Sequence, residues 1–305
     1  MNPLSVPALT PGKRIGLIAP AGPVSLPQVE QGIQLLEAYG LKVEVGRHAF
    51  SDNGITSAPE KERLEDIIDF YQNPAIHAIW ALRGGYGTIQ LLEMLDFSIL
   101  AQHPKLLIGF SDVTALQWAI YQQIRMPMAS GLTLTLQVND DNRYLGESFE
   151  ILSGQRLSVS NDDLIDDEVK VFQEGYAEGT LIGGTLSMIC TLCGSPFWLK
   201  QKNLIVYLED VSEPLYRIDR CLRQLQLAGF WEQVSGVILG KYVYNDGFVD
   251  ALPLITPLLP KDIPIVYDFP YGHFGSSFLL PVGVEARLDT SPFKLQWQSF
   301  FQQIT

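Results

Sequence analysis

The sequence predicts an α/β protein with an open, mainly parallel sheet in an N-terminal domain and a smaller, β-rich mixed C-terminal domain. Two observations predict this class. From Arg14 to Gln123, short apolar runs alternate with segments of helical spacing, an order typical of an open parallel sheet with helices on both faces. After Gly175, strand-like runs outnumber helical segments, which indicates a mixed domain.

Four strands and four helices are predicted in the N-terminal part. The strands are short apolar or alternating runs, at residues 14–19, 41–45, 76–82 and 106–110. The helices carry apolar side chains on one face, as Val29, Ile33 and Leu36 do in the first, and cover residues 28–39, 60–71, 88–95 and 112–123. Ligands of such sheets bind beyond the carboxyl ends of the strands, so the loops after the third and fourth strands are candidate site loops.

The composition changes between about residues 139 and 174, where acidic and polar residues leave only brief apolar pieces. We interpret this stretch as a crossover, and expect an N-terminal domain at 1–140, a linker at 141–174 and a C-terminal domain at 175–305. The last of these contains a short apolar segment at 186–192 and helical spacing at 215–228 and 251–258. Its predicted strands cover residues 178–184, 204–209, 236–239, 263–267, 278–284 and 293–297.

Composition argues against several classes of protein. A hydrophobic fraction of 47% and a charged fraction of 18% over 305 residues describe a globular chain with ample core. A formal net charge of -13 argues against a nucleic-acid surface, which needs clustered Lys and Arg. We find no signal peptide and no apolar run near the ~20 residues of a membrane span, and three cysteines are too few for a disulfide framework. We therefore expect a soluble cytoplasmic protein with no nucleic-acid or membrane partner.

Ser111 stands where the fourth predicted strand turns abruptly into a helix that begins at Asp112. A serine at such a turn is pushed out of the sheet, and its hydroxyl lies at a helix N-terminus, where N–H groups and the helix dipole favour negative charge. That geometry suits a nucleophile whose reaction builds an oxyanion. The stretch alone leaves open an ordinary N-cap, because Ser and Asp are common capping residues.

A serine nucleophile needs a base, and histidine is the usual one near neutral pH. The chain has four histidines. His48 lies in a polar loop, and His77 and His103 lie towards the amino ends of their strands, the wrong end of the sheet. His273 lies in the glycine-flanked turn PYGHFGSS after a strand, so elimination favours His273.

A carboxylate usually orients a catalytic histidine and stabilises its charged form. Glu209 ends the apolar run LIVYLE and is the best-placed candidate, with Asp210 beside it. Because neighbouring positions on a strand face opposite ways, we expect only one of the two to point to the site.

An oxyanion needs two N–H donors aimed at one point. The amide of Asp112 is one natural donor. Gly84 or Gly85 of the RGGYG turn can supply the other, because glycine allows close backbone approach. Arg83 beside them is a candidate partner for a substrate carboxylate. The alternative is a tight βα turn, since RGGYG has neither the Gly-Lys-Ser/Thr nor the full G-x-G-x-x-G of phosphate loops.

Cys190 and Cys193 form a C-x-x-C pair. A second such pair is missing from the sequence, the surroundings are apolar, and a structural zinc ion needs four ligands. We interpret the two as buried structural thiols and expect neither a metal ion nor another cofactor.

Several blocks of the sequence match one family in that family's order, between about Lys13 and Leu288. They are ALRGGYG, LLIGFSDVTAL, LIGGTLSM, YLEDVSEPLYRIDRCLRQL, and FPYGH followed by LPVG. In these blocks the chain resembles the LD-carboxypeptidases among the serine peptidases, that is, the murein tetrapeptide carboxypeptidases and their microcin-immunity relatives. The GFSD and LED…YRIDR blocks are specific to that family, whereas RGGYG alone is not.

The resemblance implies a Rossmann-like N-terminal domain and a β-rich C-terminal domain. It also implies a triad of Ser111, Glu209 and His273, and a cytoplasmic homodimer. It also implies hydrolysis of an L,D-peptide bond, with release of the terminal D-alanine of the murein tetrapeptide during peptidoglycan recycling. The alternative within the family is an immunity-type amidase that cleaves aminoacyl-nucleotide antibiotics. This alternative needs an aromatic platform for adenine, and Trp198 is a candidate. A binding protein with a degraded site is a further alternative, against which the intact triad residues argue.

The chain departs from the family pattern in three places. Many members have Gly-Gly-Asn where this chain has Gly183-Gly184-Thr185, and residues 126–128 and 274–277 do not match. These departures concern the choice of substrate more than the chemistry.

Overall fold

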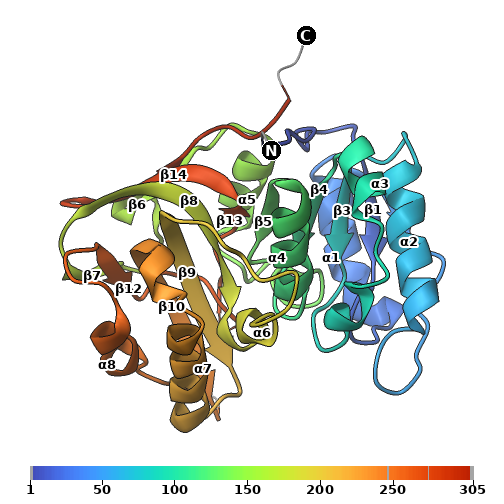
Figure 1. The fold of residues 1–305 in the computed structure, drawn as a ribbon. Coiled ribbons are helices and arrows are strands. Elements are labelled where there is room, and N and C mark those ends of the chain that lie inside the picture. The colour runs from blue at the N-terminus through green and yellow to red at the C-terminus, as the bar shows by residue number, and fades with distance from the viewer. Residues whose placement is uncertain (1–2, 246, 274, 303–305) are drawn as a thin grey trace.

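The computed structural model describes residues 3–245, 247–273 and 275–302, which form two β-sheets with helices packed on them (Figure 1). Phe274, one of the residues that the family pattern does not match, lies outside the described residues. The α/β class and the mainly parallel first sheet are confirmed.

The first sheet has six strands in the order β13-β5-β4-β3-β1-β2. Strands β1 to β5 are parallel to one another, and β13 pairs antiparallel with β5. The strands are β1 (Arg14–Ile18), β2 (Lys42–Val45), β3 (Ala78–Ala81), β4 (Leu106–Gly109), β5 (Met128–Ser130) and β13 (Leu280–Val282). The last strand comes from near the end of the chain, so a segment from the C-terminal part completes the first sheet.

Five α-helices lie in the N-terminal half: α1 (Leu26–Ala38), α2 (Glu60–Gln72), α3 (Phe97–Gln102), α4 (Val113–Ile124) and α5 (Leu145–Leu152). The helix predicted at 88–95 is only a short 3-10 turn, Thr88–Leu91. Its first N–H group is captured by the side chain of Asp112, and it follows Gly87 at φ +126°. The chain then starts α3 afresh at Asp96, whose carboxylate caps the helix by accepting the N–H of Ser98.

The second sheet has the strand order β6-β15-β14-β8-β9-β10-β12-β7, and β11 pairs with β10. Strands β8, β9, β10 and β12 are parallel, whereas the strands outside them pair antiparallel. The strands are β6 (Ser158–Ser160), β7 (Lys170–Gln173), β8 (Tyr176–Thr185), β9 (Leu204–Val211), β10 (Val234–Tyr244), β11 (Gly247–Phe248), β12 (Ile265–Tyr267), β14 (Val284–Thr290) and β15 (Phe293–Trp297). The helices are α6 (Leu186–Thr191), α7 (Leu215–Leu227) and α8 (Leu252–Ile255).

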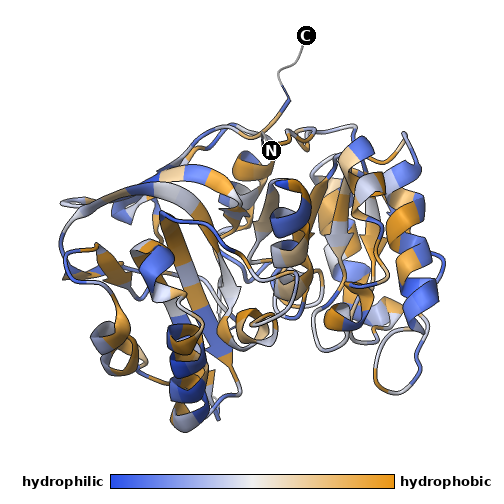
Figure 2. Ribbon diagram, viewed as in Figure 1, coloured by the Kyte–Doolittle hydropathy of each residue, from blue (hydrophilic) through white to orange (hydrophobic). Residues whose placement is uncertain are grey.

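One apolar core runs through both sheets. In Figure 2 the central strands are mostly apolar, and α2 and α7 each present a polar face opposite an apolar one. Helix α4 follows β4 of the first sheet but also contacts the second sheet. Its Trp118 donates the indole N–H to the carbonyl of Gly183 in β8 over 2.9 Å. Within the described ranges, no helix combines the length and the apolar character that a membrane crossing requires.

Candidate active site

Ser111 lies on a strained turn between β4 and α4. Its φ is +64°, in the left-handed region that a non-glycine residue seldom adopts. The N-cap position of α4 belongs to Asp112 and not to Ser111, and the side chain of Asp112 makes no capping hydrogen bond. A serine on a sharp strand-to-helix turn, with its hydroxyl outside the sheet, has the backbone geometry of a nucleophile elbow.

Three side chains from distant parts of the chain meet at this turn. The imidazole Nε2 of His273 lies 2.8 Å from Ser111 Oγ, and its Nδ1 lies 2.8 Å from Glu209 Oε2. Ser111 follows β4 of the first sheet, Glu209 is on β9 of the second, and His273 is in the loop after β12. The structure therefore brings together the three residues that the sequence singled out, across the junction of the two sheets.

The hydrogen bonds define the roles that the imidazole can take. With Nδ1–H donating to Glu209, Nε2 is left to accept the hydroxyl proton of Ser111. Burial lowers the pKa of His273, but the charge of Glu209, its hydrogen bond and the charge of Asp210 outweigh burial, so the pKa lies above its usual value. The ring also packs on Phe110 at a centroid distance of 4.4 Å, which limits its rotation.

The two adjacent carboxylates on β9 face opposite ways, as expected. Glu209 faces His273 and is fully buried, whereas Asp210 accepts the N–H groups of Ser187 over 2.7 Å and Val211 over 2.9 Å. Burial, together with the charge of Glu209, raises the pKa of Asp210 to about 7. Glu209 is therefore the carboxylate that contacts His273, and Asp210 binds the N–H of Ser187 at the start of α6.

The RGGYG loop passes directly over Ser111. A Cβ added to Gly84 would lie 2.5 Å from Ser111 Cβ and 2.7 Å from its Oγ, so only glycine fits there. The same point lies 3.3 Å from the amide nitrogen of Asp112. Gly85 has φ +106°, and its N–H and that of Asp112 have no acceptor within the described part of the chain.

Residues that the sequence did not indicate hold this loop in place. Asp112 is buried; its Oδ2 accepts the N–H of Thr88 over 2.8 Å, and its carbonyl accepts the Thr88 hydroxyl over 2.6 Å. The buried guanidinium of Arg63 donates to the carbonyls of Pro20 and Gly87 over 2.8 and 2.9 Å. No periodicity marks Thr88 or Arg63, because their partners are backbone groups far away in the sequence.

Arg83 lies at the edge of the same loop and is half-buried. One arm of its guanidinium donates to the carbonyl of Pro23 over 2.8 Å, and the N–H of Gly22 donates to the carbonyl of Gly84 over 2.9 Å. Arg83 thus holds the turn at Gly22 and Pro23 against the RGGYG loop.

We expect the Gly84→Ala variant to lose about 10²- to 10³-fold in kcat/KM, because the added methyl group displaces Ser111 and the donors beside it. Gly146→Ala is the matched control, since a Cβ at that exposed position of α5 meets nothing within 4 Å. Steady-state kinetics compares kcat/KM of the two variants, and a thermal melt checks that both are as stable as the wild type. A Gly84→Ala enzyme as active as the control would contradict the close contact of this loop with Ser111.

Trp198 cannot serve as a platform for a nucleotide base. It is only 6% exposed and packs in a cluster with Trp118 and Phe230, at centroid distances of 6.3 and 5.5 Å. The expectation that an aromatic surface is available at Trp198 is therefore wrong. Its position in an apolar run does not distinguish a core tryptophan from a platform.

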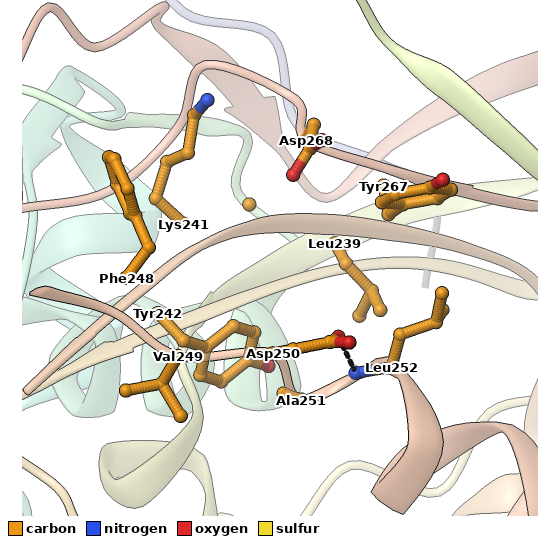
Figure 3. A pocket seen from close by; sticks show the side chains of 11 residues that line it. Leu239, Lys241, Tyr242, Phe248, Val249, Asp250, Ala251, Leu252, Tyr267 and Asp268 are labelled. Carbon is orange, nitrogen blue, oxygen red and sulfur yellow. Dashed lines mark hydrogen bonds between the residues drawn. The ribbon is translucent and has the colours of Figure 1, made fainter.

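A cavity of about 470 Å³ lies at the carboxyl ends of β10 and β12 (Figure 3). It is close to the site, because a Cβ added to Gly240 in its wall would lie 3.3 Å from Glu209 Cβ, yet it does not include the triad residues. Its charged groups already have partners: Lys241 lies 3.5 Å from Asp167, and Asp268 pairs with Lys170 over 2.9 Å. We therefore assign this cavity no ligand.

Within the described residues, no group of three or more His, Cys, Asp or Glu side chains could hold a metal ion. Cys190 is buried and donates to the carbonyl of Cys221 over 3.3 Å, and Cys193 is partly exposed. The expectation of a buried thiol is therefore confirmed for Cys190 and wrong for Cys193.

Comparisons with known proteins agree with this geometry. Two sequence models of one family match the chain, the LD-carboxypeptidase N-terminal domain over residues 15–131 and the LD-carboxypeptidase C-terminal domain over residues 178–288. The murein tetrapeptide carboxypeptidase of Pseudomonas aeruginosa is 32% identical over 298 residues, covering 93% of this chain and 95% of that protein.

Solved structures are similar over nearly the whole chain. The muramoyltetrapeptide carboxypeptidase of Oxalobacter formigenes has a TM-score of 0.81 at 28% identity, over 95% of this chain and 100% of that one. The microcin self-immunity protein MccF in complex with aspartyl sulfamoyl adenosine has a TM-score of 0.89 at 24% identity, over 98% and 100%, which shows a shared fold. Both family models and the identity to the Pseudomonas protein lead to one conclusion: the chain belongs to the LD-carboxypeptidase family of serine-type peptidases.

Proposed function

We propose that this protein is a serine carboxypeptidase that hydrolyses the L,D-peptide bond before a terminal D-alanine, with the murein tetrapeptide as its substrate. The observation that carries the proposal is the pair of 2.8 Å contacts that link Ser111 to His273 and His273 to Glu209. The names of the Pseudomonas and Oxalobacter relatives support this choice of substrate.

In the proposed mechanism, His273 Nε2 takes the proton of Ser111 Oγ while Oγ attacks the carbonyl carbon that precedes D-alanine. Glu209 holds the imidazole by Nδ1 and stabilises its positive charge. The tetrahedral intermediate then collapses, the C–N bond breaks, and His273 gives its proton to the departing amine. A water molecule, deprotonated by His273, then attacks the acyl carbon. The bond between this carbon and Ser111 Oγ breaks, His273 returns its proton to Oγ, and the tripeptide is released.

We assign the oxyanion to the N–H groups of Asp112 and Gly85. The carbonyl of Gly84 accepts a hydrogen bond from Gly22. Because the carbonyl and the next N–H of a trans peptide point opposite ways, the N–H of Gly85 points away from Gly22. This orientation favours Gly85 over Gly84 as the second donor, a choice that the sequence left open.

Arg83 is our candidate for recognising the terminal carboxylate of the peptide. We expect Arg83→Gln to raise KM about 10- to 100-fold with little change in kcat, because a charge-assisted hydrogen bond to the substrate is lost. The wild type should prefer a free terminal carboxylate over a terminal carboxamide, and the variant should lose that preference. Arg47→Gln, at an arginine 73% exposed on the surface, is the control. Equal discrimination by wild type and Arg83→Gln would contradict this role.

The proposed function is tested by offering the purified protein two substrates, the murein tetrapeptide and an aminoacyl-sulfamoyl adenosine, and following the products by mass spectrometry. We expect release of D-alanine from the tetrapeptide. Cleavage of the adenosine compound alone would instead support the immunity-type amidase, although Trp198, the aromatic platform expected from the sequence, is buried. Turnover of neither compound would contradict both and favour a binding protein.

We also propose that the enzyme acts in the cytoplasm, on peptides of peptidoglycan recycling, as a homodimer. These proposals rest on the resemblance of the motif blocks to the family. The division into domains at 1–140 and 175–305, joined by a linker at 141–174, also remains a proposal; the matches of the two family models at 15–131 and 178–288 support it.

A further inference from the structure

Thr185 is the last residue of β8 and lies directly beside Glu209. Strands β8 and β9 are parallel, and Thr185 is the register partner of Glu209. The hydroxyl of Thr185 donates to Glu209 Oε1 over 2.6 Å, while the other oxygen, Oε2, contacts His273 over 2.8 Å. Both oxygens of the carboxylate are thus engaged, one on each side.

We propose that Thr185 is a positioning residue of the triad, whose hydroxyl fixes the Glu209 carboxylate in the rotation that aims Oε2 at His273. This inference rests on the proposed function. Glu209 is fully buried and Thr185 is 4% exposed, so solvent has little access to Oε1. A carboxylate oxygen left without its donor in such a place would turn to find another, and Oε2 would turn with it.

The position of Thr185 is itself fixed by the helix that follows the nucleophile. Its N–H donates to the hydroxyl of Thr114 over 3.2 Å, and Thr114 is in the first turn of α4, three residues after Ser111. Gly184 makes this approach sterically feasible: it has φ +134°, and an added Cβ would lie 2.5 Å from Thr114 Oγ1. A chain of hydrogen bonds therefore runs from Ser111 through His273, Glu209 and Thr185 back to Thr114 of α4.

These hydrogen bonds give a structural role to a residue that departs from the family pattern. Thr185 stands where many family members have Asn, a difference that suggests an effect on substrate choice. Here the side chain touches the triad carboxylate, and both Thr and Asn can donate a hydrogen bond to a carboxylate oxygen. We therefore expect substitutions at Thr185 to change turnover rather than substrate affinity.

The test uses Thr185→Val, which keeps the branched shape and removes the donor, and Thr185→Ser, which restores the donor. The matched control is Thr180→Val on the same strand. Thr180 is 2% exposed, and its hydroxyl donates to Glu285, a glutamate outside the triad, over 2.9 Å. Both valine variants thus lose a buried threonine hydroxyl, but only Thr185→Val loses a hydrogen bond to Glu209.

We expect Thr185→Val to lower kcat for D-alanine release about 10- to 100-fold with unchanged KM, since misalignment of a reacting group costs up to about 10²-fold. Thr185→Ser should recover most of the rate, and Thr180→Val should match the wild type. In a Glu209→Gln background, Thr185→Val should have no further effect, because the partner is already gone. Thr185→Ala replaces the valine variant if the latter does not fold.

A second readout separates this inference from the proposed function. The rate at which a fluorophosphonate labels Ser111 depends on the activated serine and not on the peptide substrate. Wild-type protein that is labelled but releases no D-alanine would overturn the proposed substrate only. Equal labelling rates and equal kcat for wild type and Thr185→Val would overturn the positioning role of Thr185, as would a loss of rate that Thr185→Ser fails to recover.

Discussion

Ser111→Ala is expected to reduce kcat for D-alanine release by a factor on the order of 10⁶, because removal of the nucleophile leaves only binding and the oxyanion donors. The hydroxyl makes its hydrogen bond with His273, and the φ of +64° is equally strained for alanine. We therefore expect the melting temperature to change little. The measurement is product release by mass spectrometry beside a thermal melt.

Ser148→Ala is the matched control for this variant. Ser148 is 1% exposed on α5, and its hydroxyl donates to the carbonyl of Tyr144 over 2.7 Å, away from the triad. Its kcat should equal that of the wild type. A Ser111→Ala enzyme that keeps a hundredth or more of the rate would show that another group makes the attack.

Glu209→Gln is expected to reduce kcat by about 10⁴-fold while the shape of the side chain is preserved. An amide can present its NH₂ group to Nδ1 of His273, which stabilises the tautomer that carries its proton on Nε2. That tautomer cannot accept the proton of Ser111. Glutamine also lacks the negative charge that stabilises the imidazolium formed during the reaction.

The same variant should move the pH profile of kcat/KM. His273 works as a base when neutral, so activity falls as the pH drops through its pKa, which lies above the ordinary 6.5. Loss of the Glu209 charge lowers that pKa, so the acidic limb should shift to lower pH. The pairing of Glu209 with charged His273 contributes its full stability below about pH 6.5, and this contribution is lost as the pH rises through the raised pKa of His273.

Asp210→Asn is the matched control for Glu209→Gln. It removes the neighbouring buried carboxylate but leaves the contact between Glu209 and His273 intact, so the loss of rate should be far smaller. The acidic limb should shift in the same direction by less, because the charge of Asp210 contributes less to the raised pKa of His273. Equal losses in the two variants would contradict the assignment of Glu209.

The local part of the site could be predicted from the sequence. The turn at Ser111 could be predicted because an apolar run typical of a strand ends a few residues before helical spacing begins. Both patterns depend only on residues that are close in the sequence. Glu209 lies near the carboxyl end of β9 and His273 follows β12, and the carboxyl ends of parallel strands gather ligand-binding residues. Elimination among only four histidines made His273 identifiable.

The rest depends on contacts between distant segments, which leave no periodic signal. The pairing of β13 with β5 joins residues about 150 positions apart, and nothing in either run specifies that partner. Thr88 and Arg63 act on backbone groups, so their chemistry is not visible as a motif. Thr185 stood out in the sequence only as a departure from the family pattern, and its contact with Glu209 requires the register of β8 and β9.

The central claim is that Ser111, His273 and Glu209 act as one catalytic unit across the two sheets. The most direct test is kcat for D-alanine release by the three single variants (Ser111→Ala, His273→Ala and Glu209→Gln) and by the triple variant. Residues that act as a unit show strongly non-additive losses. We predict that the triple variant retains the same residual rate as Ser111→Ala alone. Losses that multiply from one variant to the next would show three independent contributions and would contradict the triad.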